Sequence, residues 1–305
     1  MNPITAGTEV KPMIYEEIAG NKRASYLLFF LFISFIVFLG WIFGEAFALG
    51  HLGIAIAIVL AIILSIAAYY NSDKIVLAIS RARPASREEF PHLYHTVDGL
   101  AIAAGISKPK CYVIDDTAPN AFATGRDPEH AVICVTTGLL KKMNRAELEG
   151  VIAHEMSHIK NYDIRFMMLV TVMVGIVALM SDFMLRSFIW GGRSRNRGGG
   201  SMVIIGIALL LAVLAPIAGV LMKMALSRRR EYLADASGAL LTRYPEGLAS
   251  ALEKLAADKE PLEAANKATA HLYIINPLTG RKSRLNNLFS THPPLEERVK
   301  RLRAM

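Results

Sequence analysis

Hydrophobic residues gather in four long stretches of this chain. The first two, Ala24 to Gly44 and Ala46 to Ser72, contain no Asp, Glu, Lys or Arg. Each supplies the roughly 20 apolar residues that a helix needs to cross about 30 Å of hydrocarbon. The other two lie between Phe166 and Trp190, where Asp182 interrupts the run, and between Ser201 and Met222. The pattern predicts a membrane hairpin of two spans, followed later by a second hydrophobic hairpin.

Basic residues beside the first hairpin predict its orientation. Lys22 and Arg23 precede the first span, the connection from Glu45 to Gly53 carries neither Lys nor Arg, and Lys74 and Arg81 follow the second span. Cytoplasmic flanks of membrane helices carry an excess of Lys and Arg. The N-terminus and the chain after the second span are therefore expected to face the cytoplasm.

The connection inside the second hairpin carries four arginines: Arg186, Arg193, Arg195 and Arg197. Because basic residues favour the cytoplasmic side, this connection is not expected outside the cell. Two crossings are favoured here, and a re-entrant hairpin on the cytoplasmic side stays open. In either case the chain after residue 227 returns to the compartment of the chain before residue 166. The two polar halves can then meet.

Those polar halves show the periodicities and turn signals of both helices and strands. The expected helices run from Arg87 to Ala104, from Arg145 to Lys160, from Pro245 to Asp258 and from Pro294 to Arg303, and the expected strands are Cys111 to Ile114 and Ala131 to Val135. The sequence therefore predicts an α+β fold that is mainly α-helical.

Composition agrees with a membrane protein and narrows the choice of partners. The 305 residues are 53% hydrophobic, and the mean hydropathy is +0.36. The net charge of +8 comes from Lys and Arg that cluster beside the apolar spans, and no nucleic-acid motif accompanies them, so no nucleic-acid partner is expected. Cys111 and Cys134 are far apart and form no C-x-x-C pair, so both are expected to be buried thiols.

The motif HEMSH carries the clearest chemical signal. Asn144 and Glu147 form a capping-box pattern that starts the helix. Residues four apart lie on one face of a helix, so His154 and His158 can hold one zinc ion while Glu155 lies beside it. This is the H-E-x-x-H pattern of zinc hydrolases, in which the carboxylate is the general base.

A catalytic zinc needs a third protein ligand, and the motif EYLAD supplies a candidate. Glu231 and Asp235 lie one turn apart on the expected helix after the second hairpin. Glu231 is the expected ligand, and Asp235 is expected to accept the free ring N–H of a ligating histidine. Ala234, Ala236 and Gly238 would allow close helix packing. The alternative is that Glu231 pairs with a neighbouring arginine on a solvated helix.

The segment PNAFATG lies between the two expected strands. Asn120, Ala121, Phe122 and Ala123 alternate in a way that suits an edge strand, which would pair with an extended peptide substrate. An ordinary turn and strand without a substrate role explains the same residues equally well.

Together with the hydrophobic hairpins, HEMSH, EYLAD, PNAFATG and the near-terminal STHPPLEERVKRL resemble the HtpX family of membrane-bound zinc endopeptidases over nearly the whole chain. The resemblance implies a gluzincin with one zinc on His154, His158 and Glu231, and with Glu155 as catalytic base. It implies a multi-pass protein of the cell membrane whose active site faces the cytoplasm. Its partners would be the lipid bilayer and unfolded or damaged membrane proteins, which it helps to degrade.

The resemblance also adds two residues from the C-terminal motif. In the family this region lies near the active site, so His292 is a candidate to stabilise the oxyanion or contact the zinc, and Arg298 to hold a nearby carboxylate. A helix-capping role for His292 before Pro293 and Pro294 stays open.

The resulting organisation is a multi-span membrane protein with a zincin-like catalytic domain split by a transmembrane hairpin. Its parts are a cytoplasmic N-terminus (1–23), a transmembrane hairpin (24–72), the first catalytic half (73–165), a second hydrophobic hairpin (166–226) and the second catalytic half (227–305). A CAAX prenyl-protein protease and a membrane protein with a structural metal are the alternatives. Four spans are few for the former, and a Cys-poor ligand set disfavours the latter. The sequence leaves the substrates and the oligomeric state open.

Overall fold

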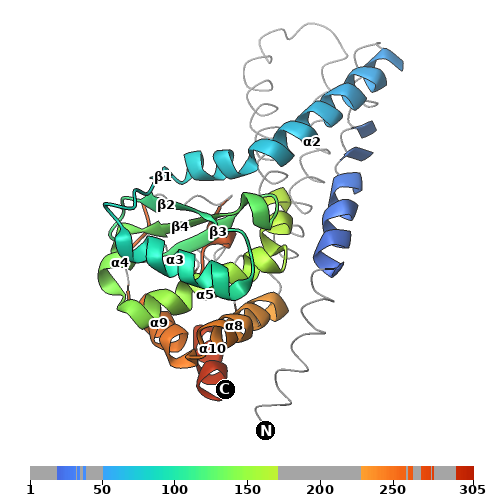
Figure 1. Cartoon of the computed structure of the whole chain (residues 1–305). Helices are drawn as coiled ribbons and strands as arrows, with labels where there is room; N and C mark the ends of the chain where they lie inside the picture. Colours follow the sequence, from blue (N-terminus) through green and yellow to red (C-terminus); the bar gives the residue numbers. More distant parts are fainter. Residues whose placement is uncertain are drawn as a thin grey trace, which may run out of the picture.

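The computed structural model describes residues 19–38 except 32, 35 and 36, residues 51–170, residues 228–275 except 259 and 264–268, residue 277 and residues 293–305. Most of the second predicted hairpin lies outside these described residues, and so does His292. The organisation of the catalytic halves can be followed in Figure 1, where colour runs from blue at the N-terminus to red at the C-terminus.

A four-stranded sheet forms one layer of the fold, in the order β1-β2-β4-β3. β1 (Arg83–Pro84) is antiparallel to β2 (Lys110–Ile114), β2 is parallel to β4 (Val132–Thr136), and β3 (Ala121–Thr124) is antiparallel to β4. The strands predicted at 111–114 and 131–135 are confirmed to within one residue. The segment around Phe122 is a strand at the end of the sheet, whereas β1 was not predicted.

Two layers of helices lie on one side of this sheet (Figure 1). The first contains α3 (Pro91–Ala104) and α5 (Arg145–Lys160). The second contains α8 (Arg228–Thr242), α9 (Pro245–Ala257) and α10 (Leu295–Arg303). Because α5 contacts β3 as well as α3, α8 and α9, it is the central helix of the domain. The mainly helical α+β fold predicted from the sequence is thus confirmed.

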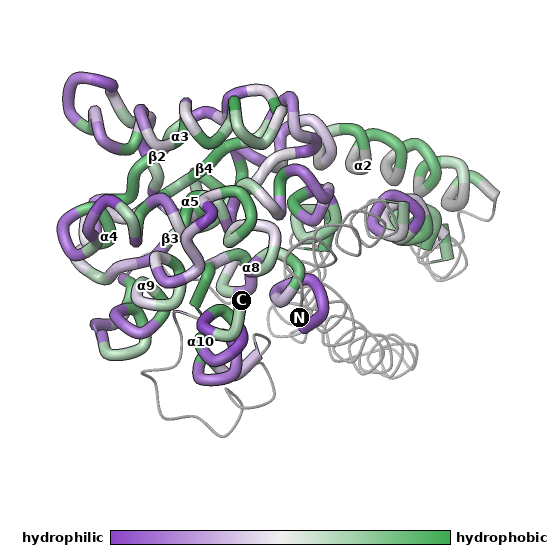
Figure 2. The backbone as a smooth tube through the Cα atoms, turned by 60° about the horizontal axis from the view of Figure 1, so that its bottom comes forward, coloured by the Kyte–Doolittle hydropathy of each residue, from purple (hydrophilic) through white to green (hydrophobic). Residues whose placement is uncertain are grey.

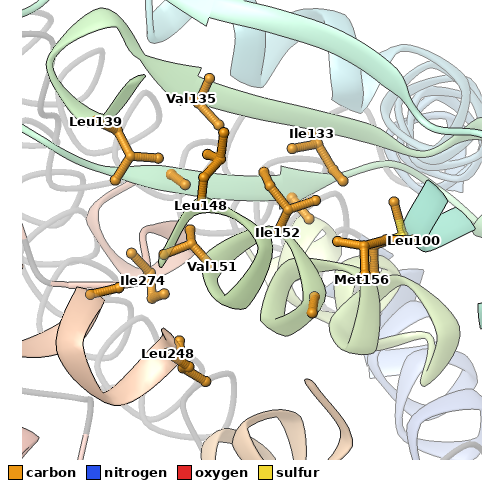
Figure 3. Close-up of a cluster of buried hydrophobic side chains, with 14 of the residues drawn as sticks. Leu100, Ile133, Val135, Leu139, Leu148, Val151, Ile152, Met156, Leu248 and Ile274 are labelled. Atoms are coloured by element: carbon orange, nitrogen blue, oxygen red, sulfur yellow. The ribbon is translucent and has the colours of Figure 1, made fainter. Parts of the chain in front are cut away.

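Helix α5 is buried on every side from Gly150 to Ile159, and its side chains fill the core. Leu148, Ile152 and Met156 pack with Ile133 and Val135 of β4 (Figure 3). Burying each such side chain contributes about 1.5–3 kcal/mol. At Gly150 an added Cβ would lie 2.6 Å from the backbone nitrogen of Leu248, so only glycine lets α9 approach this closely. The helix that carries the histidines is therefore held rigidly by its neighbours.

The ends of α5 follow from its sequence. The Asn144 side chain accepts a hydrogen bond from the Glu147 N–H, and the Glu147 carboxylate accepts one from the Asn144 N–H. This capping box satisfies two backbone donors that the first turn leaves without partners. The predicted helix from Arg145 to Lys160 is confirmed at both ends, as are the predicted helices at 245–258 and 294–303 to within one residue.

Helix α3 corrects one predicted boundary. The sequence predicts a helix from Arg87, but α3 begins at Pro91. Proline restricts the preceding residue away from the helical region, and Phe90 has φ −127° and ψ 60°. Proline itself suits the first helical position, since its missing N–H would be unpaired there. The predicted end is confirmed, because Gly105 closes α3 with a left-handed φ of 66°.

The N-terminal hydrophobic region contains helical residues 19–31 and α2 (His51–Ile79), which continues seven residues beyond the predicted hairpin end at residue 72. Figure 2 colours most of α2 as hydrophobic and most of α10 as hydrophilic. In the described part of the chain, no helix has both the length and the apolar character of a membrane crossing. The two-span hairpin therefore stays a prediction.

Candidate metal centre

Three buried side chains from α5 and α8 converge on one point. His154 and His158 lie one turn apart on α5, and their Nε2 atoms are 3.2 Å from each other. The Glu231 carboxylate of α8 lies 3.7 Å from the Nε2 of His154 and 3.6 Å from the Nε2 of His158. None of the three is more than 5% exposed. The structure thus brings together the three predicted zinc ligands.

Each of the two imidazoles has a carboxylate next to its other ring nitrogen. The Nδ1 of His154 lies 2.9 Å from an Asp235 oxygen, and the Nδ1 of His158 lies 2.9 Å from an Asp163 oxygen. When each ring gives its Nδ1 proton to that carboxylate, its Nε2 lone pair is free to bind a cation. Two imidazole nitrogens and a carboxylate that face one another at these distances could share one bound cation.

The spacing and chemistry of these donor atoms fit zinc. Ligands about 2.0–2.2 Å from a tetrahedral ion are roughly 3.4 Å apart, and the observed separations are 3.2–3.7 Å. Two histidines and one glutamate are a known donor set for catalytic zinc that leaves one position open for water or substrate. Among the described residues, these three make the one group that suits a metal ion.

Asp235 lies between His154 and a buried arginine. Its carboxylate accepts hydrogen bonds from the Nε and Nη2 of Arg298 at 2.8 and 2.7 Å. Burial raises the pKa of Asp235, but the charge and hydrogen bonds of Arg298 outweigh burial and hold that pKa well below its usual value. Arg298 is fully buried and also donates to the carbonyl oxygen of Ile274. Asp235 therefore stays ionised and orients His154.

Asp163 performs the corresponding task for His158, and sequence reasoning missed it. It follows α5 after the turn at Asn161 and Tyr162, and only 2% of its surface is exposed. Burial lowers the pKa of His158, but the hydrogen bond to Asp163 and the charges of Glu231, Asp163 and Glu155 raise it to about 9. The sequence does show an aspartate soon after the motif. However, Asp163 follows His158 by five residues, and side chains five apart do not share a helix face.

Glu155 lies on α5 between the two ligand histidines and is 2% exposed. Burial raises the pKa of its carboxyl group, and the positive charges of the two histidines partly oppose this. The backbone N–H of Ala123 in β3 donates to the carboxylate. The candidate base is thus held against the edge strand that the sequence singles out for substrate.

The outer edge of β3 is already partly paired with a distant segment of the same chain. Ile274 donates its backbone N–H to the carbonyl of Ala121 at 3.0 Å, and the Asn120 amide donates to the carbonyl of Ile275 at 3.0 Å. Phe122 and Tyr273 pack edge to face with ring centroids 5.0 Å apart. In the predicted substrate segment, Asn120 to Phe122 therefore contact residues 273–275 of the same chain, whereas Ala123 contacts Glu155.

Small residues let α8 approach α5 closely. A Cβ added at Gly238 would lie 3.0 Å from the backbone nitrogen of His154. Contacts of this kind are tighter than real Cβ atoms usually make, so a larger residue would push α8 and Glu231 away. The close packing predicted from Gly238 is confirmed.

The remaining candidates are less informative. Cys111 and Cys134 are buried free thiols, as predicted, and burial raises the pKa of both. His130 contacts Asp127 at a surface turn, and His271 is buried beneath the sheet edge. Neither lies in the group of metal-binding side chains.

Comparisons with known proteins agree with this site. The family "Peptidase family M48" matches residues 87–305. The chain is 50% identical over 298 residues to a Protease HtpX homolog of Dictyoglomus thermophilum, covering 97% of this chain and 96% of that protein. It is 46% identical over 296 residues to a Protease HtpX homolog of Thermoanaerobacter pseudethanolicus, covering 96% and 98%. Among solved structures, S. mikatae Ste24p has a similar fold, with TM-score 0.52, 21% identity, and coverage of 94% of this chain and 67% of that one.

Proposed function

This chain belongs to peptidase family M48, and from that membership we propose that it is a zinc endopeptidase of the cell membrane that cuts unfolded or damaged membrane proteins at the cytoplasmic face. His154, His158 and Glu231 would hold the zinc, and Glu155 would be the general base. Membership of a peptidase family disfavours the alternative of a purely structural metal. The full-length likeness to HtpX homologues favours this function over a CAAX prenyl-protein protease.

The convergence of the two Nε2 atoms and the Glu231 carboxylate carries this proposal. Both Nδ1 atoms face carboxylates, which leaves the two Nε2 atoms, 3.2 Å apart, to bind a metal together with Glu231. Zinc bound there would polarise the substrate carbonyl and lower the pKa of water towards about 7. The chain supplies the rest of the chemistry through its own side chains.

Glu155 moves the protons of the reaction. It takes one from the attacking water as the new C–O bond forms, and gives it to the amine nitrogen as the C–N bond breaks. A pKa raised by burial suits this task, since the carboxyl group must both accept and release a proton. The hydrogen bond from Ala123 fixes the carboxylate beside β3. No covalent enzyme intermediate is required.

The substrate backbone would approach at the Ala123 end of β3. An extended peptide that pairs with a strand edge is recognised through its backbone, with little demand on its sequence. Ile274 already uses the carbonyl of Ala121, which leaves the end of the strand next to Glu155 for substrate. Such recognition suits a protease that acts on many unfolded chains.

Apolar side chains on α2 support a membrane location. They are between 40% and 59% exposed at Leu52, Ile56, Ile58, Val59, Ile62, Ile63 and Ile66. Large exposed apolar patches are rare on water-soluble surfaces, whereas lipid tails solvate them well.

Alkaline phosphatase fused after Met305 tests the orientation. It should stay inactive if the C-terminus faces the cytoplasm, and activity would contradict that orientation.

The variant Glu155→Gln tests the proposed function. It keeps the size of the side chain and removes the base, so cleavage of an unfolded reporter protein should fall at least 100-fold while one zinc per chain remains. Glu149→Gln is the matched control, because Glu149 lies on the same helix and pairs with Arg145. Cleavage by Glu155→Gln at the rate of the control would overturn the proposal.

A further inference from the structure

A buried asparagine near the N-terminus reaches the carboxylate behind His158. Asn21 is 1% exposed and belongs to the helical residues 19–31, drawn in blue beside the end of α5 in Figure 1. Its Nδ2 donates to Asp163 at 2.6 Å and to the backbone carbonyl of Asn161 at 2.9 Å. Both protons of the amide are therefore used on the turn that follows α5.

The two oxygens of Asp163 have different tasks. Oδ2 accepts the Nδ1–H of His158, and Oδ1 accepts the amide of Asn21. Arg230 of α8 lies farther away, with its Nε 3.6 Å from Oδ1. A carboxylate held by one oxygen keeps the direction of its other oxygen, and that direction fixes the tautomer and plane of the imidazole. Asn21 is thus joined to the Nε2 of His158 through two short hydrogen bonds.

We propose that Asn21 is a positioning residue of the metal centre, which orients His158 through Asp163. The chain brings it from 142 residues away in sequence, on the helix that the hydropathy pattern predicts as the start of the first membrane span. The N-terminal helix is then part of the active site rather than an anchor alone. This inference rests on the proposed function, because His158 must bind zinc for its orientation to matter.

The choice of side chain agrees with this role. A buried carboxylate oxygen without a partner is costly, and an asparagine amide supplies donors without a second full charge. Within its own helix, the Asn21 carbonyl accepts a hydrogen bond from the buried Ser25 hydroxyl at 2.7 Å.

Zinc affinity of the full-length, detergent-solubilised chain tests the proposal, with a chromophoric chelator as competitor. Asn21→Leu keeps the volume and removes both donors, so zinc should bind about tenfold more weakly, the lower end of the range for changes behind a metal ligand. Asn71→Leu is the matched control and should bind as the unmodified chain does, because the Asn71 amide donates to the α2 carbonyl of Ala67 and, among the described residues, not to the metal centre. Asn21→Ala replaces the leucine variant if that one does not fold.

Two readouts separate positioning from general destabilisation. With cobalt(II) in place of zinc, the visible absorption bands should shift in Asn21→Leu and not in the control, because they follow the ligand geometry. In protein that already carries Asp163→Ala, Asn21→Leu should weaken zinc binding no further. Asn21 acts through Asp163, so the effects of the two substitutions should not add.

Equal zinc affinity and equal cobalt bands in Asn21→Leu and the unmodified chain would overturn this inference alone. A full tenfold loss on top of Asp163→Ala would also overturn it, since Asn21 would then act without Asp163. Failure of the unmodified chain to bind zinc would overturn the proposed function, and this inference with it.

Discussion

The two histidines of one helical turn are supported by different parts of the chain. His154 is held by Asp235 and Arg298, which we call the His154 support, and both come from the C-terminal half. His158 is held by Asp163 and Asn21, which we call the His158 support. The first support is a buried ion pair with two short hydrogen bonds, whereas the second ends in a neutral amide and has Arg230 only at 3.6 Å. The metal centre therefore joins segments from both ends of the chain.

This difference predicts where the site tolerates change. A buried ion pair is strongly destabilising when one partner is removed, because the other charge stays buried. Loss of a neutral amide leaves the Asp163 carboxylate with one hydrogen bond fewer and with Arg230 nearby. Changes in the His154 support should destabilise the fold as well as the metal site, whereas changes in the His158 support should mainly affect the metal.

Arg298→Met should give the largest loss of stability, since it leaves Asp235 buried without its cation. The free energy of unfolding should fall by about 3–5 kcal/mol, measured by chemical denaturation of the metal-free protein. Arg303→Met is the control on the same helix, because Arg303 is half exposed and pairs with Glu246 and Glu253 at the surface. That control should lose at most about 1 kcal/mol. Similar losses for the two variants would refute the buried ion pair.

Asp235→Asn and Asp163→Asn compare the two supports directly. Each removes the carboxylate that fixes one imidazole, so zinc affinity should fall by about 10–100-fold in both. Only Asp235→Asn also takes from a fully buried guanidinium its two-hydrogen-bond anion and leaves it Glu231 at 3.5 Å, so it alone should lower the melting temperature strongly. If Asp235→Asn and Asp163→Asn had equal melting temperatures but unequal zinc affinities, the proposed difference between the two supports would be wrong.

Asn144→Ala should give the smallest effect, because it acts on the helix that both histidines share. Loss of this N-cap should cost about 1 kcal/mol of stability. The cap lies more than two turns from His154, so zinc affinity should stay within twofold of the unmodified chain. A larger loss of zinc affinity would show that the supports do not fix the histidines independently of the helix start.

Local patterns in the sequence predicted much of this site. The capping box at Asn144 predicted the bounds of α5, and helical spacing placed His154, His158 and Asp235 correctly. Asp163 was missed because it lies beyond the turn at Asn161 and Tyr162, where the 3.6-residue period of α5 no longer indicates which side chains meet. The loss of regular geometry at a helix end, rather than distance in sequence, hid this residue.

Contacts between distant segments were the other gap. Asn21 and Asp163 are 142 residues apart, and Ile274 pairs with Ala121 across a similar separation. Neither contact has a periodic signature, because each depends on how α8, α10 and the N-terminal helix pack around α5. The two-residue strand β1 was likewise too short for alternation to indicate it.

The zinc content of Glu231→Ala tests the central claim most directly, namely that one zinc is shared between α5 and α8. The unmodified chain should retain one zinc per chain after dialysis against a mild chelator. Glu231→Ala should retain less than a tenth of that amount, and Glu246→Ala, changed at an exposed glutamate, should retain all of it. Full retention of zinc by Glu231→Ala would contradict the account.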